Sequence, residues 1–257
     1  RDETGKDVKG TTENVLRLAI DLPPAAAAGP VAVELDGSKL EAAPAAGTAR
    51  IFLERDEKGW RPAGPPAAGL KGPHRSGGFR DAFRRGFVFV YGTRGDDAED
   101  ARTFGKARFD AEMFWVRGNA SVELVPDTAF VPARFKDRSV ILYGNSDTNA
   151  AWLKRLAGCP VELRNGRARV GEKSIAGGDL AAYFVRPRPG SDIASVGAVA
   201  WTGYAGWVAA SPGQYFISGA GFPDLLLFSA ETLRSGAAGV RAVGWFGNDW
   251  SLEAGDF

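Results

Sequence analysis

Hydrophobic and polar positions alternate in the N-terminal part of the chain. Three segments share this alternation: residues 12–22, 31–35 and 49–55. The pattern is typical of half-buried strands. Turn-forming residues at 36–37 and 57–59 separate strand candidates, as expected of antiparallel pairs. We therefore predict a small all-β, sandwich-like module over residues 1–66, with no helix in it.

A segment rich in proline and glycine, residues 62–73, follows this module. These residue types end both helices and strands, so we place a domain boundary after residue 66. Beyond it the apolar runs are continuous rather than alternating, as expected of strands that are covered on both faces. The continuous runs lie at residues 86–93, 121–125, 139–145 and 194–203.

Segments with helical periodicity lie between these runs. The clearest covers residues 98–117, ends at Gly118-Asn119, and has apolar residues near a helical period at Ala101, Phe104, Ala107, Ala111, Phe114 and Trp115. Further helices are predicted over 148–156 and 222–235. Because strands that alternate with helices form βαβ units, we predict an α/β domain over residues 67–257 with a doubly wound, mainly parallel sheet. Within residues 160–173, the sequence Arg164-Asn-Gly-Arg predicts a β-hairpin.

The charge balance argues against a nucleic-acid or membrane partner. The chain has 32 lysines and arginines against 31 acidic residues, so no large basic surface is expected. The nearest approach to a basic patch is formed by Arg75, Arg80, Arg84 and Arg85. Asp81 interrupts this group, and we interpret it as a solvated surface. No run of about 18 apolar residues is present to cross a bilayer. Residues 1–4 show no hydrophobic signal region, and we interpret the chain as a piece of a longer one.

Histidine and cysteine are too scarce for most catalytic and metal sites. The chain has one cysteine, Cys159, and one histidine, His74. A single cysteine excludes an intrachain disulfide, and the usual zinc sites need several such ligands. The serine-hydrolase motif Gly-x-Ser-x-Gly is absent, so a self-contained Ser-His-Asp triad is not expected. We predict no catalytic residue, no metal and no cofactor, and we interpret His74 as a loop residue and Cys159 as a small buried one.

Two similar segments supply a candidate ligand site. Residues 88–97 and 140–149 each contain a strand, then Tyr-Gly, then small polar residues ahead of a helix. The carboxyl ends of parallel strands face the ligand crevice of an open α/β sheet. The candidate ligand-binding residues are Gly92, Thr93, Arg94, Gly144, Asn145, Asp147 and Asn149. Their alternative role is to form tight turns and helix N-caps.

The chemistry of these residues narrows the ligand class. Arg94 is the one fixed positive charge among the candidates, which favours an anionic or polyhydroxylated ligand. Residues 201–207 form a third glycine-containing strand end, but the nucleotide-binding glycine motifs are absent. The seven tryptophans are compatible with stacking on sugar rings or with a place in the core. We interpret the acidic pairs Asp96-Asp97 and Glu99-Asp100 as a helix start.

Several segments together resemble a known family. They are residues 10–18 (Gly-Thr-Thr-x-Asn-Val-x-Arg-Leu), Gly72-Pro73, Asp81-Ala-Phe, Val90-Tyr-Gly-Thr, Trp115-Val-Arg-Gly-Asn, residues 137–149 and Phe184-Val-Arg-Pro-Arg-Pro-Gly-Ser. These segments are similar to the C-terminal region of large bacterial prolyl-oligopeptidase-like proteins, of the kind found in planctomycetes. The resemblance implies that a catalytic α/β-hydrolase domain, with its serine, aspartate and histidine, lies upstream. It also implies a peptidase or esterase setting that is secreted or periplasmic.

Three hypotheses for the function follow. The first is a non-catalytic accessory region of a serine hydrolase, which supports the catalytic domain, assembles subunits or helps to hold a polysaccharide or peptide substrate. Its expected partner is the upstream catalytic domain, and a homo-oligomer is compatible with this role. The second is a stand-alone glycan-binding or small-molecule-binding α/β domain. The third is an esterase whose site carries no familiar motif.

Overall fold

The computed structural model describes residues 6–213, 215 and 221–257. We based the interpretation of the chain as a piece of a longer one on residues 1–4. These residues lie outside the described part of the chain. The chain divides into two compact units, Arg1–Ala67 and Ala68–Phe257. Each unit has its own hydrophobic core.

The first unit consists of two three-stranded sheets. One has the order β1 (Asp7–Gly10), β3 (Val31–Leu35), β4 (Ser38–Ala42), and the other β2 (Arg17–Asp21), β5 (Arg50–Asp56), β6 (Gly59–Ala63). Buried side chains from both sheets form one core, with Val33 and Ile51 among its members. No helix occurs among the described residues of this unit. The predicted β-rich, sandwich-like module is therefore consistent with the structure.

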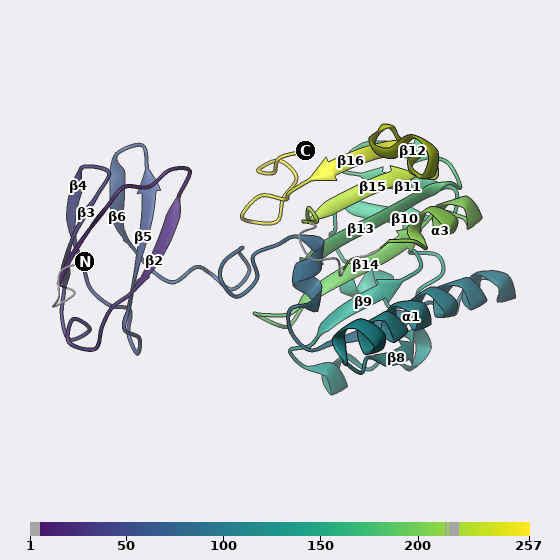
Figure 1. The fold of residues 1–257 in the computed structure, drawn as a ribbon, viewed down its shortest axis with the longest axis horizontal. Helices are drawn as coiled ribbons and strands as arrows, with labels where there is room; N and C mark the ends of the chain where they lie inside the picture. Colours follow the sequence, from purple (N-terminus) through teal and green to yellow (C-terminus); the bar gives the residue numbers. More distant parts are fainter. Residues whose placement is uncertain (1–5, 214, 216–220) are drawn as a thin grey trace. The chain divides into compact units, whose positions relative to one another are not determined.

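The second unit is built on a seven-stranded sheet (Figure 1). Its order is β16 (Val240–Gly244), β15 (Leu225–Ser229), β13 (Leu180–Pro187), β14 (Ser195–Trp201), β9 (Ser139–Tyr143), β7 (Phe87–Tyr91) and β8 (Glu123–Pro126). Strands β14, β9, β7 and β8 pair in parallel. Strands β13, β15 and β16 join by antiparallel pairing. The sheet is therefore mixed.

The prediction of a doubly wound, mainly parallel α/β domain is wrong. Strands contain 35% of the residues and helices only 22%. This is too little helix to cover both faces of a parallel sheet, as a doubly wound fold requires. The physical reason lies in the short connection 188–194 between β13 and β14. A parallel crossover needs a dozen or more residues, so this connection makes the two strands antiparallel.

The predicted helix over 222–235 is also wrong. This segment forms β15, whose sequence Leu-Leu-Leu-Phe-Ser is almost entirely buried, and then only the short helix α4 (Thr232–Ser235). A continuous apolar run of this length fits a covered strand as well as a buried helix turn. The remaining short helical turns are η2 (Asp127–Ala129), η3 (Pro132–Phe135) and η4 (Gly236–Gly239).

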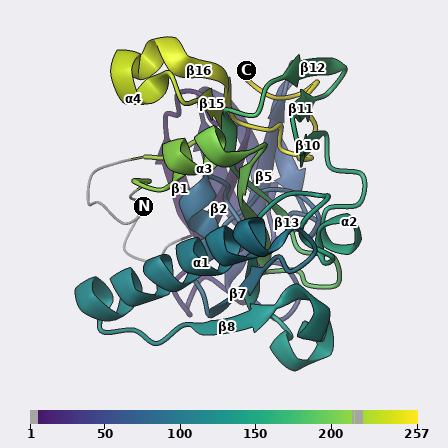
Figure 2. The ribbon, with the colours of Figure 1, turned by 90° about the vertical axis from the view of Figure 1, so that its right-hand side faces the viewer.

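Different elements cover the two faces of the large sheet (Figure 2). Helices α1 (Asp97–Gly118) and α3 (Tyr204–Ala210) lie on one face, with the turn η1 (Phe79–Phe83). The small sheet β10 (Val161–Arg164), β11 (Arg167–Val170), β12 (Lys173–Ala176) and the single turn α2 (Trp152–Arg155) lie on the other. The hairpin expected within 160–173 is confirmed by the antiparallel pair β10–β11.

Helix α1 confirms the strongest helix prediction. Asp96 caps its first turn, because its side chain accepts a hydrogen bond of 2.8 Å from the amide of Glu99. Asn119, with a φ of 48°, ends the helix in the left-handed region that Asn tolerates. Ala107 and Phe114 pack toward the sheet as expected, whereas Phe104 and Trp115 are exposed.

Candidate functional site

The two similar strand ends lie next to each other. Gly92, Thr93 and Arg94 follow β7, and the loop from Gly144 to Asn149 follows β9. Because Tyr91 and Tyr143 are paired in the parallel ladder, both loops leave the same edge of the sheet. The amide of Arg94 donates a hydrogen bond of 3.0 Å to the carbonyl of Thr148. The structure thus brings the seven candidate residues together.

Asn145 uses both ends of its amide inside the protein. Its Oδ1 accepts hydrogen bonds from the amides of Asp147 and Thr148, at 2.9 and 3.2 Å. Its Nδ2 donates to the carbonyl of Trp201 at 2.9 Å and to Oδ1 of Asn165 at 2.7 Å. The side chain is fully buried. Asn145 therefore joins the ends of β9 and β14 to the β10–β11 turn.

Asn149 has a similar role between β7 and β9. Its Nδ2 donates to the carbonyls of Val90 and Tyr143 at 3.0 and 2.9 Å, and its Oδ1 accepts from the amide of Ala151 at 3.0 Å. Only 1% of the residue is exposed. These contacts hold the loop after β9 against the ends of β7 and β9. Asn149 is therefore a buried residue whose side chain joins the ends of the two strands.

The remaining candidates include residues with internal contacts and one exposed residue. Thr93 donates to Oδ1 of Asp127 at 2.6 Å, and Oδ2 of Asp147 accepts from the amide of Asn165 at 3.0 Å. A Cβ on Gly92 would collide with the carbonyl of Thr148, so the close approach of the two loops requires glycine there. Arg94 is exposed.

The β10–β11 turn packs against the same edge of the sheet as the two candidate loops. The amide of Gly166 donates to the carbonyl of Thr202 at 2.7 Å, which holds the turn over the end of β14. Nδ2 of Asn165 lies 3.4 Å from Oε2 of Glu99. Burial raises the pKa of Glu99, and the Asn165 hydrogen bond offsets this only in part. Sequence reasoning treated Glu99 only as a helix-start residue and missed its burial, because Asn165 is distant in the sequence.

His74 and Cys159 have ordinary structural contacts. Nε2 of His74 lies 3.2 Å from the carbonyl of Ala68. Sγ of Cys159 accepts from the amide of Val161 at 3.4 Å, and burial raises the pKa of its thiol. Within the described residues, no group of His, Cys, Asp and Glu is arranged to hold a metal ion. Nothing in these contacts builds a nucleophile-base pair.

A buried ion pair lies beneath α1 and was not expected from the sequence. Nζ of Lys106 is 2.9 Å from Oδ1 of Asp110 and donates to the carbonyl of Ser211 at 3.1 Å. The hydroxyl of Tyr143 donates to Oδ2 of Asp110 at 3.0 Å. Burial raises the pKa of Asp110 and lowers the pKa of Lys106. The group ties α1 to β9 and to the end of α3.

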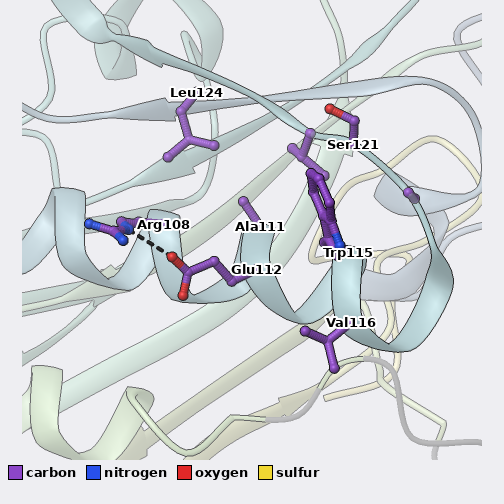
Figure 3. Close-up of a pocket in the computed structure, with 9 residues that line it drawn as sticks. Arg108, Ala111, Glu112, Trp115, Val116, Ser121 and Leu124 are labelled. Atoms are coloured by element: carbon purple, nitrogen blue, oxygen red, sulfur yellow. Dashed lines mark hydrogen bonds and ion pairs between the residues drawn. The ribbon is translucent and has the colours of Figure 1, made fainter.

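An open groove lies between the second half of α1 and the segment that leads into β8 (Figure 3). Its volume is about 500 Å³. It is lined by Arg108, Ala111, Glu112, Trp115, Val116, Ala120, Ser121, Val122 and Leu124. Trp115 is 68% exposed, and its ring stands upright toward Ser121 in Figure 3. Nε of Arg108 pairs with Oε1 of Glu112 at 2.7 Å across one turn of the helix.

Comparison with known proteins identifies no family for this chain. No protein-family model matches the chain, and no curated protein matches it either. Among the described residues, no helix has the length and apolar character needed to cross a membrane.

Proposed function

We propose that the chain is a non-catalytic accessory region of a serine hydrolase of the prolyl-oligopeptidase-like type, and that it acts through its surface. The observation that supports a non-catalytic role is that the buried polar side chains in the loop after β9 are engaged in internal hydrogen bonds. Asn145 and Asn149 are the most buried polar candidates. The side-chain amide groups of both residues form hydrogen bonds within the protein. A residue used in this way is not free to recognise a ligand.

The contacts of His74 support the same proposal. A general base must lie within hydrogen-bonding reach of its nucleophile and is held by a third group. The ring of His74 instead contacts the carbonyl of Ala68. The hydrolase setting, the upstream catalytic domain as partner and a secreted or periplasmic location rest on the resemblance of segments such as residues 137–149.

The test of this proposal is activity of the purified chain toward serine-reactive reagents. We expect no stoichiometric labelling by a fluorophosphonate probe, and the same hydrolysis of p-nitrophenyl acetate by the wild type and by His74→Ala. Ser191→Ala is a matched control, because Ser191 is a loop serine with ordinary contacts to Asp137. Labelling of one serine that His74→Ala abolishes would overturn the proposal.

One observation favours glycan binding as a second candidate. Five of the seven tryptophans are buried or half-buried, whereas Trp115 and Trp245 are exposed. An exposed tryptophan ring beside a groove is a stacking surface for a sugar. Titration with neutral oligosaccharides, followed by tryptophan fluorescence of the wild type and of Trp115→Ala, tests this candidate. A saturating change that Trp115→Ala removes would favour it.

A further inference from the structure

A small pocket lies beside the turn η1, at the arginines that form the chain's nearest approach to a basic patch. Its volume is about 130 Å³, and it is lined by His74, Asp81, Arg84, Arg85 and Ile193. Arg84 and Arg85 are both exposed. The lining thus has two guanidinium groups and one carboxylate, which leaves an excess of positive charge in its walls.

A third guanidinium group, that of Arg75, lies in the protein next to this pocket. Arg75 is only 1% exposed, so it does not belong to the solvated surface that we expected. Its Nη1 donates to the backbone carbonyls of Ser191 and Ala194, at 3.2 and 2.7 Å, on either side of Ile193. Its Nη2 donates to the carbonyl of Ala68 at 2.7 Å. Within the described residues, its Nε is buried without a hydrogen-bond partner.

The carboxylate of Asp81 occupies only part of the donors that face it. Its Oδ1 accepts a hydrogen bond of 3.2 Å from Nη1 of Arg84, and the same nitrogen donates to the hydroxyl of Ser76 at 3.3 Å. Both contacts use Nη1, which leaves the Nε and Nη2 donors of Arg84 for another acceptor. Nη2 of Arg85 makes one long contact, of 3.5 Å, with the carbonyl of His74.

The acidic residues around the pocket do not balance its arginines. Burial lowers the pKa of Arg75, and the negative charges of Asp81 and Asp192 act against this shift. Both carboxylates therefore lie within electrostatic reach of the buried guanidinium group. Asp192 is exposed, so solvent screens its charge. The three arginines of this cluster thus retain a net positive charge that an anion would compensate.

We propose that this pocket binds one oxyanion group, a phosphate, sulfate or carboxylate group, through Arg84 and Arg85. A guanidinium group donates two parallel N–H bonds to such a group, and this geometry makes arginine the usual ligand for it. A volume of about 130 Å³ has room for one such group and a few waters, because a water molecule takes up about 30 Å³ in the liquid. The proposal goes beyond the accessory role and does not depend on the chain belonging to a hydrolase.

His74 provides a local signal for the test, because it lines the pocket and is the single histidine of the chain. Its ring-proton resonance is followed by NMR while sodium phosphate replaces sodium chloride at constant pH and ionic strength. We expect a saturating change in chemical shift with a Kd on the order of 1 mM. Sodium sulfate and sodium acetate are titrated in the same way. A change with phosphate and sulfate alone assigns a tetrahedral group, and an equal affinity for acetate assigns a carboxylate.

Two substitutions should move the affinity in opposite directions. Arg84→Gln removes a donor and a charge and should weaken phosphate binding by about tenfold. Asp81→Asn removes the carboxylate that competes for Arg84, so it should strengthen binding by about threefold or more. Arg234→Gln removes an exposed arginine of α4, outside the pocket, and is the matched control with an unchanged Kd.

A His74 resonance that moves in proportion to phosphate without saturating would overturn the proposal, since that is the behaviour of general ionic screening. A saturating change with the same Kd in Arg84→Gln and Asp81→Asn would overturn it as well. Circular dichroism checks that the variants fold. If Arg84→Gln does not, Asp81→Asn and Arg85→Gln decide, because the first should strengthen and the second weaken the binding of phosphate.

Discussion

Asn145 shows why an amide, rather than a carboxylate, stands at the end of β9. The position must accept hydrogen bonds from the amides of Asp147 and Thr148, and it must also donate to the carbonyl of Trp201. Aspartate has the acceptors but no donor, and its charge would be buried. An asparagine with no exposed surface therefore signals a structural junction, although its polar character first suggested a ligand site.

Glu99 provides a pH-dependent prediction at the same edge of the sheet. Burial raises its pKa above the ordinary value of 4.5, so ionisation costs the folded state stability that the unfolded state does not lose. The cost is absent below about pH 4.5 and grows as the pH rises through the raised pKa. We expect Glu99→Gln to be more stable than the wild type at pH 8, with the advantage shrinking toward pH 4.5.

Urea unfolding of both proteins across this pH range measures the difference. Asp97→Asn is the matched control, because Asp97 lies in the same helical turn but is exposed. Its stability difference from the wild type should stay nearly constant over the range. A Glu99→Gln advantage that is equal at both ends of the range would mean that Glu99 is ionised without cost in the folded protein.

The elements could be predicted from the sequence where local signals were sufficient. Helix α1 has a helical period, a capping aspartate and Asn119 after its last residue, and the β10–β11 hairpin has an Asn-Gly turn. Strand direction has no such local signal. The apolar run of β13 shows burial on both faces, but its antiparallel pairing depends on the length of the connection 188–194.

The candidate site was predictable only in part, for a similar reason. That the loops after β7 and β9 meet follows from two parallel neighbouring strands, and the structure has this arrangement. The partners that fill the edge could not be inferred, because Asn165 and Trp201 approach Asn145 through the folding of a hairpin and of a separate strand. The burial of Lys106 and Asp110 also had no local signal, since both occupy polar positions of a helix with charges throughout.

The Lys106–Asp110 pair gives a prediction for how α1 is held on the sheet. Lys106→Met leaves the Asp110 carboxylate buried without its cation, so we expect a loss of about 3–5 kcal/mol in the free energy of unfolding. Replacing both groups, as Lys106→Met with Asp110→Leu, should recover most of that loss, because two apolar side chains need no compensation. Chemical denaturation of the wild type, the single and the double variant measures this.

The exposed pair Arg108–Glu112 is the matched control for that experiment, with the same spacing on the same helix. Arg108→Met should cost well under about 1 kcal/mol, because exposed pairs contribute little. A double variant as unstable as Lys106→Met alone would contradict this expectation. It would show that losing the hydrogen bond from the hydroxyl of Tyr143 to Asp110 costs as much stability as leaving the Asp110 carboxylate without Lys106.

At the scale of the whole molecule, the two units have separate cores. The buried cluster of the first unit shares no residue with that of the second. A cooperative transition requires a common set of contacts, so we expect each unit to unfold on its own. The change in apolar pattern across residues 62–73 was the sequence signal for two units.

Asp36 lets this independence be tested with a single substitution in the first unit. Its carboxylate accepts hydrogen bonds from the amide and hydroxyl of Thr12 at 2.6 Å each, and from Nε1 of Trp60 at 2.8 Å. It lies in the turn between β3 and β4 and so joins its own sheet to Trp60 in β6 of the other. The hydrogen bonds from Thr12, followed by that from Trp60, lower its pKa from 3.8 to about 2.

A lowered carboxyl pKa means that the stabilisation is complete above about pH 4 and is lost as the pH falls through about 2. We therefore expect Asp36→Asn to speed amide hydrogen exchange in β3, β4 and β6 at pH 7, with exchange in β9 and β14 unchanged. Below about pH 2, the wild type and the variant should exchange alike, because the wild-type carboxyl is then neutral. Glu57→Gln, at an exposed turn of the same unit, should have no effect at either pH. Faster exchange in β9 and β14 as well would show that the two units unfold together, since a substitution in one unit would then weaken both.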